Sequence, residues 1–198
     1  TGCRSSSSVK PAYSRCHMKS LVCIATLGIV AFAVTGNAQD SKKEPTKEEI
    51  AKAMFWVPNQ HCPDCATALE GSLKKVGGIM SVAVSFPTKW ATVEFDERVI
   101  SAQEVSRAAF QAPHMMGKDM KYGTFLLLSI DAKDKATVTK AMTTLEKVEG
   151  VAKAVYYAQT KFIAIQFGDK GKVTSHQLLK ALDDAGVKAS QAGAKIKK

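Results

Sequence analysis

Cysteine is scarce in this 198-residue chain, and its placement excludes a fold held together by disulfides. Three of the five cysteines, Cys3, Cys16 and Cys23, lie within the first 38 residues. Only Cys62 and Cys65 follow. Two cysteines three residues apart cannot join distant parts of a fold, so we expect them to carry chemistry rather than structure.

An apolar run long enough to cross a membrane is also missing. The run at residues 21–34 is shorter than the roughly 20 residues that a membrane span needs. A methionine and a lysine precede it and small residues follow it, which is typical of a secretory signal peptide. We therefore predict a signal peptide over Met18–Ala38, with cleavage after Ala38, and residues 1–17 upstream of it. The predicted mature protein is periplasmic or secreted and has no membrane span; a membrane anchor is the alternative.

Strong charge patterning is absent as well. Residues 39–198 keep 24 of the 28 Lys and Arg residues and all 18 Asp and Glu residues, which leaves a net charge of +6. The charges are spread along the chain, without an arginine cluster or a basic strip rich in aromatic residues, so no nucleic-acid partner is predicted. Residues 39–50 form a polar linker. The content of 45% hydrophobic residues is ordinary for a globular protein with a core.

From residue 51 onward the chain repeats one pattern. Thr88–Phe95 matches Thr160–Phe167 at an offset of 72 residues, and the same offset relates two glycines, Gly78 and Gly150. Two copies are too few for a solenoid. We therefore predict two tandem small domains, 51–120 and 121–198, the second with a basic tail.

Each copy shows the periodicities of a β-α-β-β-α unit. This order predicts an α+β fold of two tandem ferredoxin-like βαββαβ domains, each an antiparallel sheet with helices on one face. In the first copy the predicted elements are strands 53–57, 82–86 and 90–95 and helices 63–76 and 101–113. In the second they are strands 125–130, 152–157 and 161–167 and helices 133–148 and 175–185. The fourth strands are predicted near 119–124 and at 187–192.

The motif His61-Cys62-Pro63-Asp64-Cys65 opens the first predicted helix, which ends in Leu73–Gly78. With the strand Trp90–Asp96, these residues resemble the heavy-metal-associated domains of copper chaperones, metal-pumping P-type ATPases and the periplasmic mercury-binding protein. The resemblance covers about residues 53–116. It implies a ferredoxin-like fold that binds metal through Cys62 and Cys65 and is not an enzyme.

Two departures from the family pattern stand out. Gln60 lies where the family usually has a methionine, two residues before the first cysteine. In the second copy, Asp134 and Thr137 fall where the cysteines would be. The second copy therefore resembles a degenerate domain without a thiolate site.

Two thiolates at the start of a helix suit a soft ion. Cu(I) accepts two-coordinate sulfur ligation, so Cys62 and Cys65 suffice for it. Zn(II) prefers four ligands, and two cysteines leave it short. The positive end of the helix dipole favours the thiolate of Cys65. Cu(I) is the predicted ion, and Hg(II), Cd(II) and Zn(II) are alternatives.

Further ligands are candidates near the cysteine pair. The resemblance places His114 in the loop after the second helix, where the family often has a Tyr or Lys beside the metal. His114 is therefore a candidate third ligand or a hydrogen-bond partner of a sulfur, and His61 is a weaker candidate. Met115 and Met116, with Met120, are candidates for a second Cu(I) site, or pack between the domains.

These observations predict an exported heavy-metal carrier or scavenger that passes Cu(I) to or from a metal-transferring protein partner. The alternative is a periplasmic thiol-disulfide oxidoreductase that uses Cys62 and Cys65, since a proline after the first cysteine also occurs in redox motifs. A third hypothesis is a structural or partner-binding module with incidental cysteines.

Overall fold

The computed structural model describes residues 49–132 and 134–193. The predicted signal peptide, its upstream residues and the end of the predicted basic tail lie outside this part of the chain. Within the described residues, no helix combines the length and apolarity that crossing a membrane requires.

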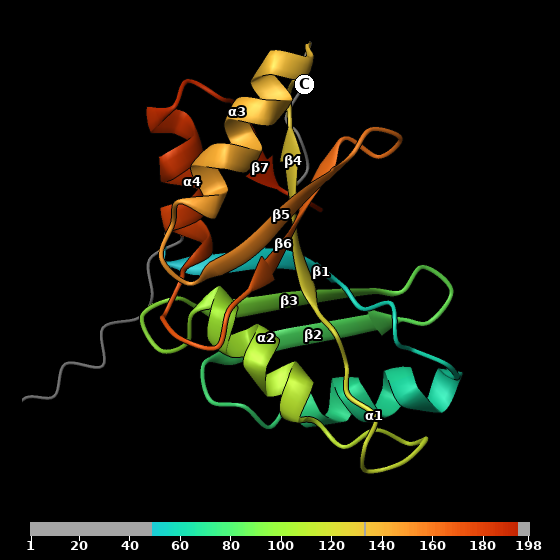
Figure 1. Ribbon diagram of the computed structural model, residues 1–198. Helices are drawn as coiled ribbons and strands as arrows, with labels where there is room; N and C mark the ends of the chain where they lie inside the picture. The colour runs from blue at the N-terminus through green and yellow to red at the C-terminus, as the bar shows by residue number, and fades with distance from the viewer. Residues whose placement is uncertain (1–48, 133, 194–198) are drawn as a thin grey trace, which may run out of the picture. The chain divides into compact units, whose positions relative to one another are not determined.

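The described elements belong to one compact unit, Lys42–Lys198, and follow the ferredoxin-like order twice. The first repeat contains β1 (Ile50–Trp56), α1 (Pro63–Leu73), β2 (Ile79–Ser85), β3 (Trp90–Asp96) and α2 (Ala102–Gln111) (Figure 1). The second contains β4 (Phe125–Ile130), α3 (Lys135–Glu146), β5 (Val151–Tyr157), β6 (Phe162–Phe167), α4 (Ser175–Asp184) and β7 (Ala189–Gln191). The predicted α+β fold class is confirmed.

All strands join one antiparallel sheet in the order β2-β3-β1-β4-β6-β5, with β7 also beside β4. The first half of β4, Phe125–Leu127, pairs with the end of β1, and its second half, Leu128–Ile130, pairs with β7. Strand β4 is thus the fourth strand of the first repeat and the first strand of the second.

The fourth strand predicted near 119–124 is therefore wrong, because those residues form no strand. They make an extended loop that leads into β4, whose apolar sequence supplies the pairing for both repeats. The second predicted fourth strand, at 187–192, is confirmed as the short strand β7.

Helices α1 and α2 lie together against the first half of the sheet, and α3 and α4 lie together against the second (Figure 1). Because the helices cover one face of the sheet, alternate side chains of β4 should lie in the core. Leu126 and Leu128 are buried in the main core, whereas Leu127 belongs to a smaller cluster. The largest fully buried side chains are Tyr122, Phe55, Phe95, Leu69, Leu73, Leu126, Leu128, Leu145, Ile163, Ile165, Leu178 and Leu182.

Gln103, on α2, ties the two repeats together. Its Nε2 donates to the carbonyl oxygens of Gly168 and Lys170 at 2.7 and 2.8 Å, and its Oε1 accepts from the backbone N–H of Val173 at 3.1 Å. Gly150, with φ +95°, lies against this contact. A Cβ there would lie 2.6 Å from Val173 Cγ2 and 3.0 Å from Gln103 Oε1. The repeats therefore interlock through a buried amide.

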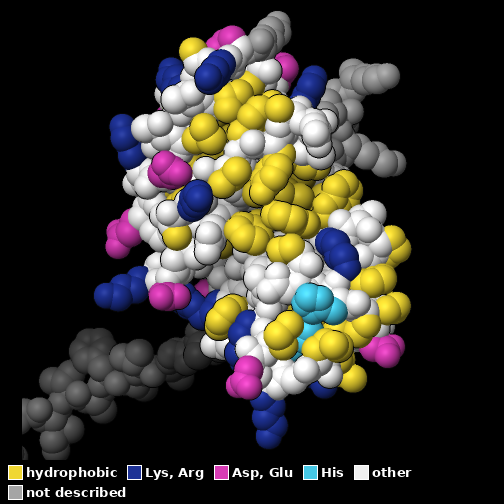
Figure 2. All heavy atoms as spheres, turned by 45° about the vertical axis from the view of Figure 1, so that its right-hand side comes forward, with side chains coloured by type: hydrophobic (Ala, Val, Ile, Leu, Met, Phe, Trp, Pro, Cys, Tyr) yellow, Lys and Arg dark blue, Asp and Glu magenta, His cyan; other side chains and the backbone are white. Residues whose placement is uncertain are grey.

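The smaller cluster around Leu127 is rich in aromatic side chains. Trp56 contacts Phe125 and Tyr157 with ring centroids 5.4 and 5.8 Å apart, and Trp90 contacts Phe162 at 6.2 Å. Figure 2 shows hydrophobic side chains gathered in the middle of the face that it presents. The open side of the sheet is thus more apolar than a fully solvated surface.

Candidate metal centre

The two cysteines lie at the first turn of α1. Cys62 is the N-cap, with φ −148° and ψ 161°, and Pro63 occupies the start of the helix, where the missing N–H costs no hydrogen bond. The backbone N–H of Cys65 donates to Cys62 Sγ at 3.3 Å. The helix start therefore turns both side chains to the same side, as the CxxC spacing predicts.

Both thiols are free, and their sulfur atoms lie 2.6 Å apart. This separation exceeds the roughly 2.05 Å of a disulfide bond. Cys65 is fully buried, whereas Cys62 is half-buried. Cys62 is thus the thiol that an incoming ion or thiolate would meet first.

The two thiols have opposite pKa shifts. The hydrogen bond shared with Cys65 and burial raise the pKa of the Cys62 thiol. Burial opposes ionisation of Cys65, but hydrogen bonds from the Cys62 thiol and from backbone groups of Cys62, His61 and Met115 outweigh it and lower the pKa of Cys65. The first proton therefore leaves Cys65, and Cys62 keeps its proton longer.

Gln60 is part of the loop between β1 and the cysteines, and its side chain points into the protein. Its carbonyl oxygen accepts a hydrogen bond from Lys89 Nζ. Its side chain is 1% exposed, and neither amide atom has a hydrogen-bond partner among the described residues. Position 60 thus has a buried amide, where the heavy-metal-associated domains usually have the thioether of a methionine.

Tyr122 lies beside the pair and was not predicted as a site residue. Its hydroxyl donates to the carbonyl oxygen of Cys65 at 2.9 Å, and its side chain is fully buried. Burial, with the charges of Cys65 and Cys62, raises the pKa of Tyr122 to about 12. The resemblance predicts a Tyr or Lys beside the metal, and the structure places Tyr122 rather than His114 in contact with the Cys65 backbone.

His114 is buried close to the pair, 7% exposed, and its ring stacks on Tyr122 at 4.5 Å. The exposed ring of His61 lies 5.8 Å from it. Met115 and Met116 follow on the surface, each 61% exposed. The structure therefore gathers all the predicted candidates at one end of the molecule, and their roles as ligands stay predictions.

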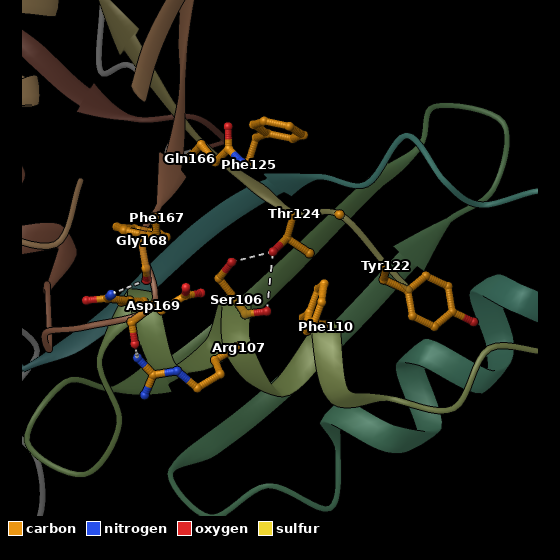
Figure 3. A pocket seen from close by; sticks show the side chains of 12 residues that line it. Ser106, Arg107, Phe110, Tyr122, Thr124, Phe125, Gln166, Phe167, Gly168 and Asp169 are labelled. Atoms are coloured by element: carbon orange, nitrogen blue, oxygen red, sulfur yellow. Dashed lines mark hydrogen bonds between the residues drawn. The ribbon is translucent and has the colours of Figure 1, made fainter. Parts of the chain in front are cut away.

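A cavity of about 230 Å³ lies beside this region, between α2, the start of β4 and the end of β6. Figure 3 shows the Tyr122 hydroxyl pointing away from the cavity and towards α1. Among the residues that line the cavity, the hydroxyls of Ser106 and Thr124 share a hydrogen bond. The Arg107 guanidinium donates to the Asp169 carbonyl oxygen at 2.8 Å. Neither cysteine lines it, so the candidate metal centre lies outside this cavity.

Among residues 49–132 and 134–193, no group of three or more His, Cys, Asp or Glu side chains is placed to hold a metal ion.

Comparisons with known proteins find similarity to a metal-binding domain family and to metal-transport proteins. Residues 54–109 match the family model of the heavy-metal-associated domain. Copper-transporting ATPase 2 of Rattus norvegicus is 24% identical over 171 residues, which cover 84% of this chain but only 12% of the ATPase. The mercuric transport protein periplasmic component of Pseudomonas fluorescens is 34% identical over 56 residues, 28% of this chain and 62% of that protein.

Solved structures show partial similarity. The water-soluble region of the P-type ATPase CopA from Bacillus subtilis is 20% identical, with a TM-score of 0.35, over 76% of this chain and 97% of that one. Oxidised MerP from Ralstonia metallidurans is 26% identical, with a TM-score of 0.33, over 39% of this chain and 96% of that one. The relatives are metal-transport proteins, so the oxidoreductase alternative is not favoured.

Proposed function

We propose that this chain binds one soft metal ion between Cys62 and Cys65, with Cu(I) as the first choice, because residues 54–109 match the family model of the heavy-metal-associated domain. The observation that carries the proposal is the pair of free thiols at the start of α1, with sulfur atoms 2.6 Å apart. The named relatives transport copper or mercury, which supports an ion of this class.

The donor set favours Cu(I) over Zn(II). Two thiolates satisfy a soft ion of low coordination number, whereas Zn(II) takes four ligands in a tetrahedron. Hg(II) and Cd(II) are also thiophilic and remain the competing cargo. Two sulfur atoms that share an ion through bonds of about 2.3 Å lie farther apart than 2.6 Å, so we expect the half-buried Cys62 side chain to turn outward when an ion enters.

The proposed role is that of a carrier or scavenger, without catalysis. Cys62 is accessible at the end of a helix, so a thiolate of a metal-transferring partner can add to the ion before a protein sulfur leaves. Cys65, buried and more acidic, supplies the thiolate that forms first. The pair has to be reduced for this exchange, because a disulfide offers no thiolate.

We also propose that the protein is exported, with the leader removed after Ala38 and the mature form periplasmic or secreted. The expected mature protein begins at Gln39, which mass spectrometry of the protein from the producing cells measures directly. An intact leader in the mature protein would contradict this proposal.

The metal site is tested by anaerobic competition titration of the reduced protein with a chromophoric Cu(I) chelator. We expect one tightly bound Cu(I) per chain, and loss of that site in the variant Cys62→Ala/Cys65→Ala. The matched control is Asp134→Ala/Thr137→Ala, at the corresponding positions of the second repeat, which should keep the site. Equal affinity of the cysteine variant and the unmodified protein would refute the proposal.

A further inference from the structure

The ring of His114 uses both of its nitrogens within the protein. Nε2 lies 3.1 Å from the carbonyl oxygen of Asn59, and the backbone N–H of Met116 donates to Nδ1 at 3.2 Å. A carbonyl oxygen only accepts, so Nε2 carries the proton and Nδ1 offers the lone pair. Neither nitrogen is left to bind a metal unless one of these bonds breaks.

These contacts hold two loops together beside the cysteines. Asn59 lies three residues before Cys62, and its side-chain Nδ2 donates to the Lys121 carbonyl oxygen at 3.1 Å. The His114 ring thus fastens the loop before α1 to the loop before β4 at one point, and Asn59 fastens them at a second.

The same ring is linked to Cys65 by two routes. It stacks on Tyr122, whose hydroxyl donates to the Cys65 carbonyl oxygen. It also fixes the turn that contains Met115, whose backbone lies within hydrogen-bond reach of Cys65. A change at His114 therefore reaches Cys65 without touching its sulfur atom.

We infer that His114 is a positioning residue of the metal site and not one of its ligands. This inference rests on the proposed function for its metal readout, but it also makes a claim about the metal-free thiols. His114 holds the Asn59 carbonyl, the Met115–Met116 turn and the Tyr122 ring in the arrangement that fixes Cys65 beside Cys62. Second-layer partners of this kind orient ligands and tune their basicity.

The test compares His114→Phe with His114→Gln. Phenylalanine keeps a ring to stack on Tyr122 but loses both hydrogen bonds, whereas glutamine offers an amide N–H and a carbonyl oxygen in their place. The control is His176→Phe, on α4 of the second repeat, where the histidine is exposed. Thermal unfolding of each variant shows whether it is folded.

Two measurements follow on the folded variants. We expect His114→Phe to weaken Cu(I) binding by about 10- to 100-fold, and His114→Gln to lose less than about tenfold. In the metal-free reduced protein at one fixed pH, the rate of iodoacetamide reaction at Cys65, located by peptide mass spectrometry, should rise in His114→Phe, because the loops beside this buried thiol are no longer fastened. His176→Phe should match the unmodified protein in both.

The measurements distinguish a failure of the positioning role of His114 from a failure of the proposed metal binding. An imidazole nitrogen in the copper X-ray absorption spectrum of the unmodified protein, lost in His114→Phe, would make His114 a ligand and overturn the inference. An unchanged rate of iodoacetamide reaction at Cys65 in folded His114→Phe would overturn it too. If His114→Phe does not fold, a loss of about 100-fold in His114→Gln would likewise overturn the inference. If the unmodified protein binds no metal, the proposed function fails, while the rate of iodoacetamide reaction at Cys65 still decides the positioning role.

Discussion

Replacing Gln60 by methionine should make the protein more stable. The Gln60 side chain is 1% exposed, and both its amide atoms lack a hydrogen-bond partner among the described residues. Methionine is also unbranched and has three rotatable bonds, so Gln60→Met exchanges a buried amide for an apolar thioether of similar shape. The hydrogen bond from Lys89 to the Gln60 carbonyl oxygen uses the backbone and is retained.

The size of the gain follows from the cost of the buried amide. Burying a polar group without a hydrogen bond costs about 1–3 kcal/mol in protein mutational data. We therefore expect the free energy of unfolding to rise by roughly that amount. For a domain of this size, each kcal/mol raises Tm by about 2–4 °C, so the expected rise in Tm is about 2–12 °C.

The measurement is thermal unfolding of the reduced, metal-free protein, followed by circular dichroism. The matched control is Gln159→Met, in the exposed turn between β5 and β6, where no polar group is buried and the change should be within about 0.5 kcal/mol. A Tm for Gln60→Met that equals or falls below that of the unmodified protein would show that the amide has a partner in solution, and the reasoning would be wrong.

Other substitutions test the interlock and the thiol pair. Gly150 has a positive φ and lies against Gln103, so Gly150→Ala should lower the free energy of unfolding by about 2–4 kcal/mol. Its control, Gly71→Ala, lies in open space on α1 and should raise the free energy of unfolding by up to about 1 kcal/mol. Equal denaturation midpoints of the two variants would contradict both expectations. Gln103→Leu should lower the free energy of unfolding by about 1–3 kcal/mol, because it leaves the buried Val173 N–H and two part-buried carbonyl oxygens of the second repeat without their partner. An unchanged midpoint in urea unfolding would show that the amide does not join the repeats. Cys65→Ala removes the hydrogen bond that raises the pKa of Cys62, so the pH profile of Cys62 alkylation should move to lower pH, and a shift to higher pH would reverse our assignment.

The start of α1 could be predicted because its signals are local. A proline directly after Cys62 marks a first helical turn, and the apolar positions that follow share one helix face. The capping box of α2 could also be predicted from the spacing of Ser101 and Glu104. The side chain of each residue accepts a hydrogen bond from the backbone N–H of the other. Elements that are set by neighbouring residues are thus recovered from the sequence.

The shared strand β4 could not be predicted in the same way. Its apolar sequence shows that residues 125–130 are a strand, but not that one edge pairs with both β1 and β7. The prediction of a separate strand near 119–124 followed from treating each repeat as complete. A strand over these residues also places Tyr122 in the sheet, whereas the structure has it in a loop, where its hydroxyl donates to the Cys65 carbonyl oxygen.

The two repeats share more than their order of elements, because the cysteine pair is a helix cap built with sulfur. Cys62 and Asp134, related by the offset of 72 residues, are both N-caps, with φ −148° and −140° and ψ 161° and 162°. Cys62 Sγ accepts from the Cys65 N–H at 3.3 Å, and Asp134 Oδ1 accepts from the Thr137 N–H at 2.7 Å.

The side chains at the third position of each turn also correspond. Thr137 Oγ1 donates to Asp134 Oδ2 at 2.8 Å, where the first repeat has the contact between the two thiols. Aspartate is a strong N-cap and sulfur a weak hydrogen-bond acceptor, so the second repeat has the better helix start. The backbone turn therefore survives either choice of side chains. Two positions, Asp134 and Thr137, are thus enough to separate a helix start with soft donor atoms from one without them.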